Sequence, residues 1–276
     1  MTQSIDSTLL SNSHPLLQLS SQPSITDRAF CYGDGIFTTM RVWQGRICLW
    51  SWHWQRLAQS AQRLGFQLPS ETSVFSALTA AITAPEQVLK LQISRGNSSR
   101  GYSPSGVGPV QCFISTAALP DYRALQHRGF CVDIAALRLA RQPRLAGIKH
   151  CSRLETVLLK AEVDGAVADE LLALDSEGFI IEASASNVFF YRDKQWFTPE
   201  LTWAGVAGVV REALLAPLNA QQINWTVAEL AGVEAAFLCS SLLGVAPIRQ
   251  LQGRELALAP VQQIQQQYAK AVWLCA

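Results

Sequence analysis

The chain has 276 residues, is 49% hydrophobic and 16% charged, and carries a formal net charge of +1 at pH 7. This balance gives no electrostatic reason to propose nucleic acid or a membrane surface as a partner, and no apolar run approaches the roughly 20 residues that span a bilayer. The first Lys or Arg is Arg28, which argues against a signal or transit peptide, so we expect a cytoplasmic protein of one or two domains.

The first half of the chain predicts a small sheet accompanied by two helices. Residues 36–42 alternate around polar side chains, and Gln44 and Gly45 behind them supply hairpin chemistry. Apolar residues recur at helical spacing further along. Helices are therefore expected at 51–64 and 74–82, and further strands at 88–94 and 110–116. The segment 95–108 is rich in Gly, Ser and Arg and predicts a loop.

The second half of the chain begins after a linker candidate at residues 118–124, which contains Pro120. We therefore divide the chain into a smaller N-terminal domain, 1–117, and a larger C-terminal domain, 125–276. Strands are expected at 130–137, 171–174, 179–183, 187–192 and 237–240, and helices at 152–164 and 209–215. Because strands and helices mix without a regular β-α-β rhythm, the predicted fold class is α+β.

Lys149 is the first of three chemically suggestive positions. It lies in the segment 145–150, with Arg144 and Arg153 near it in sequence. Nearby cations favour the neutral amine, which is the nucleophilic form of lysine. A solvated basic loop is the other interpretation, and the sequence leaves both open.

A helix start flanked by glycines and a carboxylate in an apolar segment are the other two positions. Gly205 and Gly208 precede the helix expected at 209–215, and free backbone N–H groups at a helix start bind phosphates, although glycine there is also common. Glu182 either points outward from the apolar segment 179–183 or points inward and needs a cationic partner. The four histidines share no ligand spacing, so no metal site is expected.

These three positions make chemical sense as one site. A lysine amine, a carboxylate for a ring nitrogen and a helix start for a phosphate are the anchors that pyridoxal phosphate requires. We therefore expect pyridoxal 5'-phosphate as the cofactor, held covalently by Lys149.

Six short motifs in one order carry a family resemblance. They are the segment 27–41 with its Gly33-Asp34-Gly35 core, His53-x-x-Arg56-Leu57, Lys149, Glu182-x-x-x-x-Asn187-x-Phe189, Gly208-Val209-Val210-Arg211, and Ser240-Ser241 followed by Pro247-Ile248. Together they resemble the class IV aminotransferase family of fold type IV pyridoxal-phosphate enzymes. The family includes branched-chain and D-amino-acid aminotransferases and 4-amino-4-deoxychorismate lyase. The resemblance implies a smaller N-terminal α/β sandwich and a larger C-terminal β-barrel-like domain, with the cofactor at the domain and subunit interface of a homodimer.

The resemblance also implies roles for individual residues in cofactor binding. Lys149 binds the cofactor and carries a proton during catalysis, Glu182 pairs with the pyridinium nitrogen, and Arg56 binds the phosphate through a charge-assisted fork. The remaining phosphate contacts fall to the backbone N–H groups of Val209 and Val210 and the hydroxyls of Ser240 and Ser241.

Three segments, at 37–41, 94–103 and 145–155, resemble the lyase members of the family. Chemistry gives a separate reason to consider the first of them, because alternate residues of a strand share one face. The Thr39 hydroxyl, on the face of the strand turned to the cofactor, is therefore a candidate catalytic group that protonates or orients a departing enolpyruvate. The ordinary β-propensity of threonine is the alternative explanation.

Substrate binding is expected from the same strand and from the basic loop. Phe37 and Arg41 share the strand face of Thr39. Arg100 and Tyr102 stand where D-amino-acid members of the family place a carboxylate trap contributed by the partner subunit. Aminodeoxychorismate carries two carboxylates, so such a loop suits it. A flexible solvated loop is the alternative.

The resemblance thus implies a pyridoxal-phosphate lyase that converts 4-amino-4-deoxychorismate to 4-aminobenzoate and pyruvate in folate biosynthesis, functionally coupled to aminodeoxychorismate synthase. An aminotransferase of D-amino acids or branched-chain amino acids is the alternative, because it shares every cofactor anchor. A non-catalytic protein that keeps the fold is a third possibility. A nucleotide-dependent oxidoreductase is disfavoured, since the chain contains no G-x-G-x-x-G.

Overall fold

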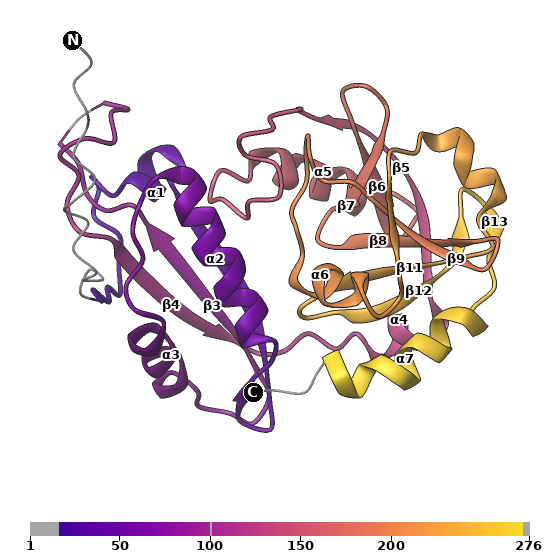
Figure 1. Ribbon diagram of the computed structural model, residues 1–276, viewed down its shortest axis with the longest axis horizontal. Helices are drawn as coiled ribbons and strands as arrows, with labels where there is room; N and C mark the ends of the chain where they lie inside the picture. Colours follow the sequence, from indigo (N-terminus) through magenta and orange to yellow (C-terminus); the bar gives the residue numbers. More distant parts are fainter. Residues whose placement is uncertain (1–16, 100, 273–276) are drawn as a thin grey trace, which may run out of the picture.

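The structure, a computed structural model, describes residues 17–99 and 101–272. Figure 1 shows a smaller lobe, in indigo to magenta, beside a larger lobe in pink to yellow. The smaller lobe contains α1 (Arg28–Tyr32), β1 (Gly35–Trp43), β2 (Arg46–Ile47), α2 (Trp50–Leu64), α3 (Glu71–Ala80), β3 (Gln87–Ser94) and β4 (Gln111–Ala117). All the strands and helices expected up to residue 117 are present, with ends that differ by a few residues.

The larger lobe carries the remaining elements. They are α4 (Arg123–Arg128), β5 (Phe130–Leu139), α5 (Leu154–Asp164), β6 (Glu170–Asp175), β7 (Ile180–Ala183), β8 (Asn187–Arg192), β9 (Gln195–Pro199), α6 (Val209–Leu215), β10 (Gln221–Ile223), the 3-10 helix η1 (Val227–Gly232), β11 (Ala235–Ser240), β12 (Gly244–Leu251), β13 (Arg254–Glu255) and α7 (Ala259–Val272). No helix in the described part of the chain is both long and apolar enough to cross a membrane.

The smaller lobe is an antiparallel sheet with helices on one face. Its strand order is β2-β1-β3-β4. Side chains of a strand alternate between its two faces, so Met40 of β1 packs in one core cluster with Leu57 of α2 and Leu78 of α3. Phe37 and Thr39 project from the opposite face, where they line a cavity. The alternation therefore separates the core of the lobe from the candidate site.

The larger lobe is built on one strongly curled sheet. Its order is β10-β9-β8-β11-β12-β5-β6-β7, with β13 paired to β12. The terminal strand β7 contacts β8 and β9, which brings the two ends of the sheet together. Inside the curl, Phe190 of β8 stacks on Trp225 at 5.9 Å, and outside it Phe189 stacks on Phe237 at 4.7 Å beneath α6 and α7. The predicted α+β, barrel-like fold is confirmed.

Strand β12 is the main element that the sequence interpretation missed. It lies in the middle of the curled sheet, between β11 and β5, although it contains Pro247 opposite Phe237. Proline lacks the N–H that a ladder needs, so its presence argues against a central strand. The pairing with β5 changes register between Ile248 and Gln250, beyond the proline.

The two lobes are joined by more than the chain between them. Ile36 of β1 forms a bridge with His150, and the Ser241 hydroxyl donates a hydrogen bond of 2.7 Å to the Thr39 carbonyl. Helix α2 also contacts α6. Residues 118–122 contain neither helix nor strand, and a domain boundary at 118–124 stays our prediction.

Candidate active site

A cavity of about 370 Å³ lies where β1 and α2 of the smaller lobe meet the larger lobe. Its lining includes Phe37, Thr39 and Arg56 from the first lobe and Tyr122, Lys149, Arg153, Thr156, Glu182, Asn187, Val206, Gly208, Val209, Ser240 and Ser241 from the second. Most of the residues expected to bind the cofactor thus surround one space.

Lys149 reaches this space from a short segment that is hydrogen-bonded on both sides. The Phe37 N–H donates to the Lys149 carbonyl at 3.0 Å, which ties the segment to β1. Two residues earlier, the Gly147 N–H donates to the Gly205 carbonyl at 2.9 Å, which ties it to the loop before α6. Backbone bonds to both lobes therefore fix where the amine enters the cavity.

The environment of Lys149 favours its neutral form. Burial lowers the pKa of this amine to about 8, and the nearby cation of Arg56 acts in the same direction. The amine Nζ lies 4.7 Å from the centre of the Phe37 ring. A lysine with a pKa near 8 is partly neutral at physiological pH and so can act as a nucleophile or a base.

Glu182 of β7 points into the cavity, so the inward interpretation holds. Its Oε2 accepts a hydrogen bond of 2.9 Å from the Val206 N–H and a longer one of 3.4 Å from the Asn187 amide. Burial raises the pKa of this carboxyl, whereas the Val206 N–H and the charges of Arg153 and Lys149 lower it. The direct partners of this carboxylate are therefore an N–H and an amide, and the two cations act on it without a described ion pair.

Asn187 connects this carboxylate to the start of α6. Its side-chain oxygen accepts from the Gly208 N–H at 3.1 Å, and its amide donates to the Val206 carbonyl at 2.9 Å. A Cβ at Gly208 would lie 2.0 Å from that oxygen, so only glycine fits this position. One amide thereby holds the glycine segment and Glu182 in a fixed relation.

Arg56 of α2 forms the opposite end of the cavity. Its Nη1 donates to the Ala207 carbonyl at 3.1 Å and its Nη2 to the Thr38 hydroxyl at 2.8 Å, while the buried Nε has no partner among the described residues. Burial lowers the pKa of this guanidinium to about 10, opposed by Glu212, so it remains a cation at pH 7. A desolvated cation with spare donors suits a dianionic phosphate.

The other predicted phosphate-binding residues gather at the same cavity. Val209, Ser240 and Ser241 line it, and Val210 is fully buried one residue further along α6. An amine, a carboxylate and a cation on separate walls therefore fit the three anchors of pyridoxal phosphate. The role of each residue stays a prediction.

Two of the predicted substrate-binding residues lie elsewhere in the described chain. Phe37 and Thr39 line the cavity, but Arg41 is absent from its described lining, and its guanidinium stacks over the Trp43 ring at 4.6 Å. The Tyr102 side chain is 83% exposed and packs on Tyr32, with ring centres 5.1 Å apart. Arg100 lies outside the described residues.

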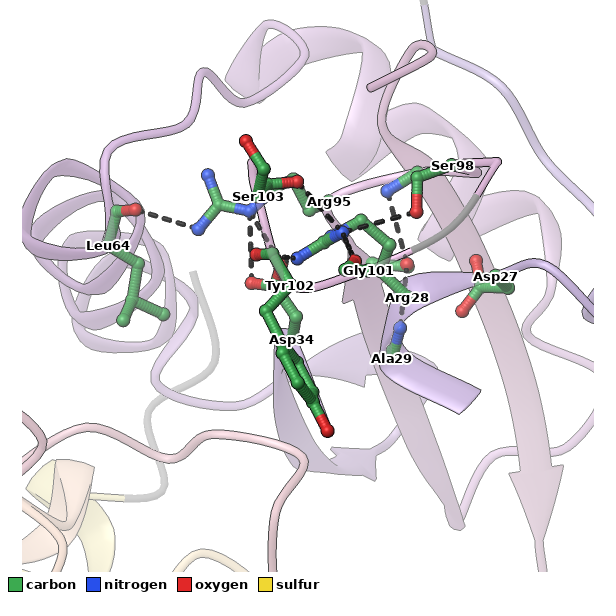
Figure 2. A network of polar contacts seen from close by, with 12 residues as sticks. Asp27, Arg28, Ala29, Asp34, Leu64, Arg95, Ser98, Gly101, Tyr102 and Ser103 are labelled. Atoms are coloured by element: carbon green, nitrogen blue, oxygen red, sulfur yellow. Dashed lines mark hydrogen bonds and ion pairs between the residues drawn. The ribbon is translucent and has the colours of Figure 1, made fainter. Parts of the chain in front are cut away.

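A single buried guanidinium holds the loop that carries Tyr102, as Figure 2 shows. Arg28 is only 3% exposed and pairs with Asp34 at 2.7 Å. Its remaining donors reach the carbonyls of Gly101, Tyr102 and Ser103 at 3.2, 2.9 and 3.1 Å, with a further bond to Ser98. These bonds hold the backbone of residues 101–103, while the Tyr102 side chain stays exposed.

Arg153, Asn187 and Tyr122 are among the lining residues to which the sequence interpretation assigned no role. Arg153 was visible near Lys149, and Asn187 stands inside a family motif, so a signal existed for both. Tyr122 comes from the segment interpreted as a linker, and burial raises its pKa. No sequence signal distinguishes a linker tyrosine that turns into a cavity from one that stays in solvent.

Comparisons with known proteins agree with this geometry. The profile of the family described as amino-transferase class IV matches residues 35–251. Aminodeoxychorismate lyase of Vibrio harveyi is 37% identical over 236 residues, which cover 83% of this chain and 87% of that protein. The crystal structure of 4-amino-4-deoxychorismate lyase from Pseudomonas aeruginosa superposes with a TM-score of 0.82 at 32% identity, over 91% of this chain and 96% of that one. A bifunctional aminodeoxychorismate lyase / D-amino acid transaminase of Mycobacterium tuberculosis is 26% identical over 96% of both chains.

Proposed function

This chain belongs to the amino-transferase class IV family, and we infer that it is a pyridoxal-phosphate lyase that converts 4-amino-4-deoxychorismate to 4-aminobenzoate and pyruvate, a step of folate biosynthesis. The observation that carries the inference is the cavity that Lys149, Glu182, Arg56 and Thr39 line together from separate elements of the two lobes. The similarity to two lyases over most of the chain supports the substrate.

Each residue proposed to bind the cofactor contributes a different chemical group. Pyridoxal phosphate, when bound, supplies an aldehyde carbon for an amine and a ring that withdraws electron density. Lys149 holds it covalently, and the Glu182 carboxylate stays beside the ring nitrogen. Arg56 would bind the phosphate, helped by the start of α6 and the Ser240 hydroxyl. The Ser241 hydroxyl, which donates to the Thr39 carbonyl at 2.7 Å, would turn to donate to the phosphate.

We assign proton transfer in the proposed reaction to Lys149 and Thr39. The 4-amino group of the substrate would replace the Lys149 amine on the cofactor, and the freed amine, with a pKa near 8, would accept the proton from C4 of the substrate. The bond between C3 and the enolpyruvyl oxygen then breaks, and the substrate ring becomes aromatic. The Thr39 hydroxyl is on the cavity wall, where it orients or protonates the departing enolpyruvate, which becomes pyruvate.

The proposal includes a homodimer whose interface borders the cavity. Leu154, Val157 and Leu158 of α5 are 70, 59 and 53% exposed and form one apolar face. Thr156 of the same helix lines the cavity, so a second copy seated on this face would lie next to the site. We expect a Leu158→Asp variant to sediment as a smaller species than the wild type or Gln262→Asp. Equal sedimentation of all three would contradict this interface.

The remaining parts of the proposal concern the source of the substrate and the cellular compartment. The substrate is a small molecule that aminodeoxychorismate synthase produces, so we propose functional coupling to that enzyme. We propose the cytoplasm as the compartment.

A paired substrate assay tests the function against its alternative. Purified protein with pyridoxal phosphate receives aminodeoxychorismate in one reaction, and D-alanine or a branched-chain amino acid with a 2-oxo acid in the other. We expect 4-aminobenzoate and pyruvate in equal amounts from the first and slow turnover in the second. Rapid transamination without 4-aminobenzoate would establish the aminotransferase instead.

A further inference from the structure

Behind Arg56 lies a pair of buried polar side chains to which none of the roles above refers. Thr38 of β1 and His53 of α2 are both fully buried, and the Thr38 Oγ1 lies 2.6 Å from the His53 Nδ1. The same Oγ1 accepts the bond of 2.8 Å from the Arg56 Nη2. The three side chains thus form a line from the core of the smaller lobe to the wall of the cavity.

The direction of each hydrogen bond in this line follows from the donors available. A guanidinium only donates, so Thr38 must accept from Arg56 and has one proton left to give. The His53 Nδ1 is the other described partner of this hydroxyl, so the arrangement that gives each of these groups a partner has Thr38 donate to an unprotonated Nδ1, with the imidazole hydrogen on Nε2. In the alternative tautomer the hydroxyl would accept from both Arg56 and His53 through its two lone pairs, and its own proton would have no acceptor among the described hydrogen bonds.

The neutral state of His53 agrees with this order. Burial lowers the pKa of the imidazole well below its ordinary value of 6.5, and the cations of Arg56 and Lys149 act in the same direction. The Nε2 has no hydrogen-bond partner among the described residues. The only polar contact of this ring in the described structure is therefore the acceptor contact with Thr38.

We propose that His53 and Thr38 are positioning residues that hold the Arg56 guanidinium in place for the cofactor phosphate. His53 turns the Thr38 hydroxyl so that a lone pair faces the Arg56 Nη2, and the Ala207 carbonyl fixes Nη1. Two of the donors are thus occupied on the protein side. Because Arg56 lines the cavity, we infer that its remaining N–H groups are available to an anion there, in an orientation set before the anion arrives.

A purely structural role would not explain this pair well. A buried hydroxyl and imidazole contribute less to stability than apolar side chains of the same shape, because both must be desolvated. They sit among apolar core residues such as Met40 and Leu57. Their contact with the one cation that forms this end of the cavity supplies a reason for their presence.

The inference rests on the phosphate role proposed for Arg56 but not on the lyase reaction, so binding measurements without substrate test it. The full-length protein is freed of cofactor and titrated with pyridoxal phosphate, with inorganic phosphate, and with pyridoxal, which lacks the phosphate. The variants are Thr38→Val and His53→Leu, each with a conservative partner, Thr38→Ser and His53→Asn. The Asn oxygen can take the place of the Nδ1 acceptor.

Thr38→Val and His53→Leu are expected to weaken binding of pyridoxal phosphate and inorganic phosphate about tenfold, the size of one hydrogen bond to a charged group. Binding of pyridoxal should stay unchanged, and Thr38→Ser and His53→Asn should restore most of the loss. Unfolding of each cofactor-free variant in urea shows whether it is folded.

Three outcomes would overturn the proposal. They are an equal loss of affinity for pyridoxal and pyridoxal phosphate, unchanged phosphate affinity in both non-conservative variants, and conservative variants as weak as the others. Should one non-conservative variant fail to fold, the other with its partner decides. A failed lyase assay with the expected binding pattern would refute the proposed reaction and leave this inference standing.

Discussion

The walls of the cavity and the loop that carries Tyr102 are held in place by different means. Lys149 stands in a segment that is hydrogen-bonded through its backbone to β1 and to the loop before α6, and Glu182 lies in a paired strand of the curled sheet. The loop depends instead on the side chain of Arg28, which reaches three of its carbonyls. The first residues of the loop also pair through the backbone with residues 26–28, but the carbonyls of residues 101–103 are held by the Arg28 side chain.

The difference indicates which single substitutions should displace a functional group and which should leave it in place. Backbone pairing survives the replacement of a side chain, so changes in the wall should alter chemistry and leave its geometry intact. A loop held by one guanidinium loses several hydrogen bonds at once when that group is removed. Wall variants should therefore lower kcat, and variants of the Arg28 contacts should raise KM while cofactor binding stays unchanged.

The largest effect is expected from Glu182→Gln. Replacing the carboxylate removes the charge beside the ring nitrogen, so kcat for 4-aminobenzoate formation should fall by about a hundredfold or more, on the order of the loss of one oxyanion-hole donor. Steady-state kinetics measure this. Glu170→Gln is the matched control, because Glu170 is also a buried carboxylate but is not among the described residues that line the cavity. Similar losses in both variants would remove the special role of Glu182.

A smaller effect is expected from Thr39→Val, which removes a hydroxyl and keeps the shape of the wall. The yellow colour of the bound cofactor should persist, and elimination should slow by about ten- to a hundredfold, in the lower range for acid–base catalysis. Thr39→Ser should retain most activity. Undiminished 4-aminobenzoate formation by Thr39→Val would refute the role of this hydroxyl and leave the cofactor assignment intact.

The loop side of the comparison is tested by Arg28→Lys. Lysine keeps a positive charge near Asp34 but cannot form the guanidinium fork. The family resemblance implies that this loop contributes to the substrate site of the partner subunit. We therefore expect KM to rise about tenfold when at least one buried hydrogen bond of the loop is lost, with the affinity for pyridoxal phosphate unchanged. Arg123→Lys, at an exposed pair with Asp121, is the control. Equal losses of cofactor and substrate binding would show that the two regions are not independent.

The smallest change is a shift in pH dependence at Lys149. Its pKa near 8 means that the neutral amine forms below the ordinary lysine value of about 10.4. In cofactor-free protein, the rate at which pyridoxal labels Lys149 should rise with pH up to about 8 and then level off. A lysine in an unstructured peptide should continue to gain reactivity toward pH 10. A Lys149 profile that follows the peptide would contradict its burial beside Arg56.

Local sequence patterns were enough to predict most of the helices and strands. The hairpin at Gln44 and Gly45, the helices at 50–64 and 209–215 and the hairpin around residues 175–178 follow from periodicity and turn chemistry, and the structure contains them. Strand β12 did not follow, because the rule against proline in a central strand is local. Its place is decided by pairing with β11 and β5, which are distant in sequence.

In the candidate site, too, some features could be predicted from the sequence and others could not. Lys149 and Arg56 could be identified because motifs mark them, and the resemblance supplied the family. The direction of Glu182 stayed open until the curl of the sheet was known. Two features were not predictable, because both depend on side-chain contacts between separate elements. They are the hydrogen bonds that connect His53 and Thr38 to Arg56, and the hydrogen bonds from Arg28 to the loop that carries Tyr102.

The central claim is that the amine of Lys149 is the covalent anchor of the cofactor. Borohydride reduction of the protein loaded with pyridoxal phosphate, followed by peptide mapping, tests it most directly. The account predicts a stable label on the peptide that contains Lys149 and on no other. A label on a different lysine, or none at all, would contradict it.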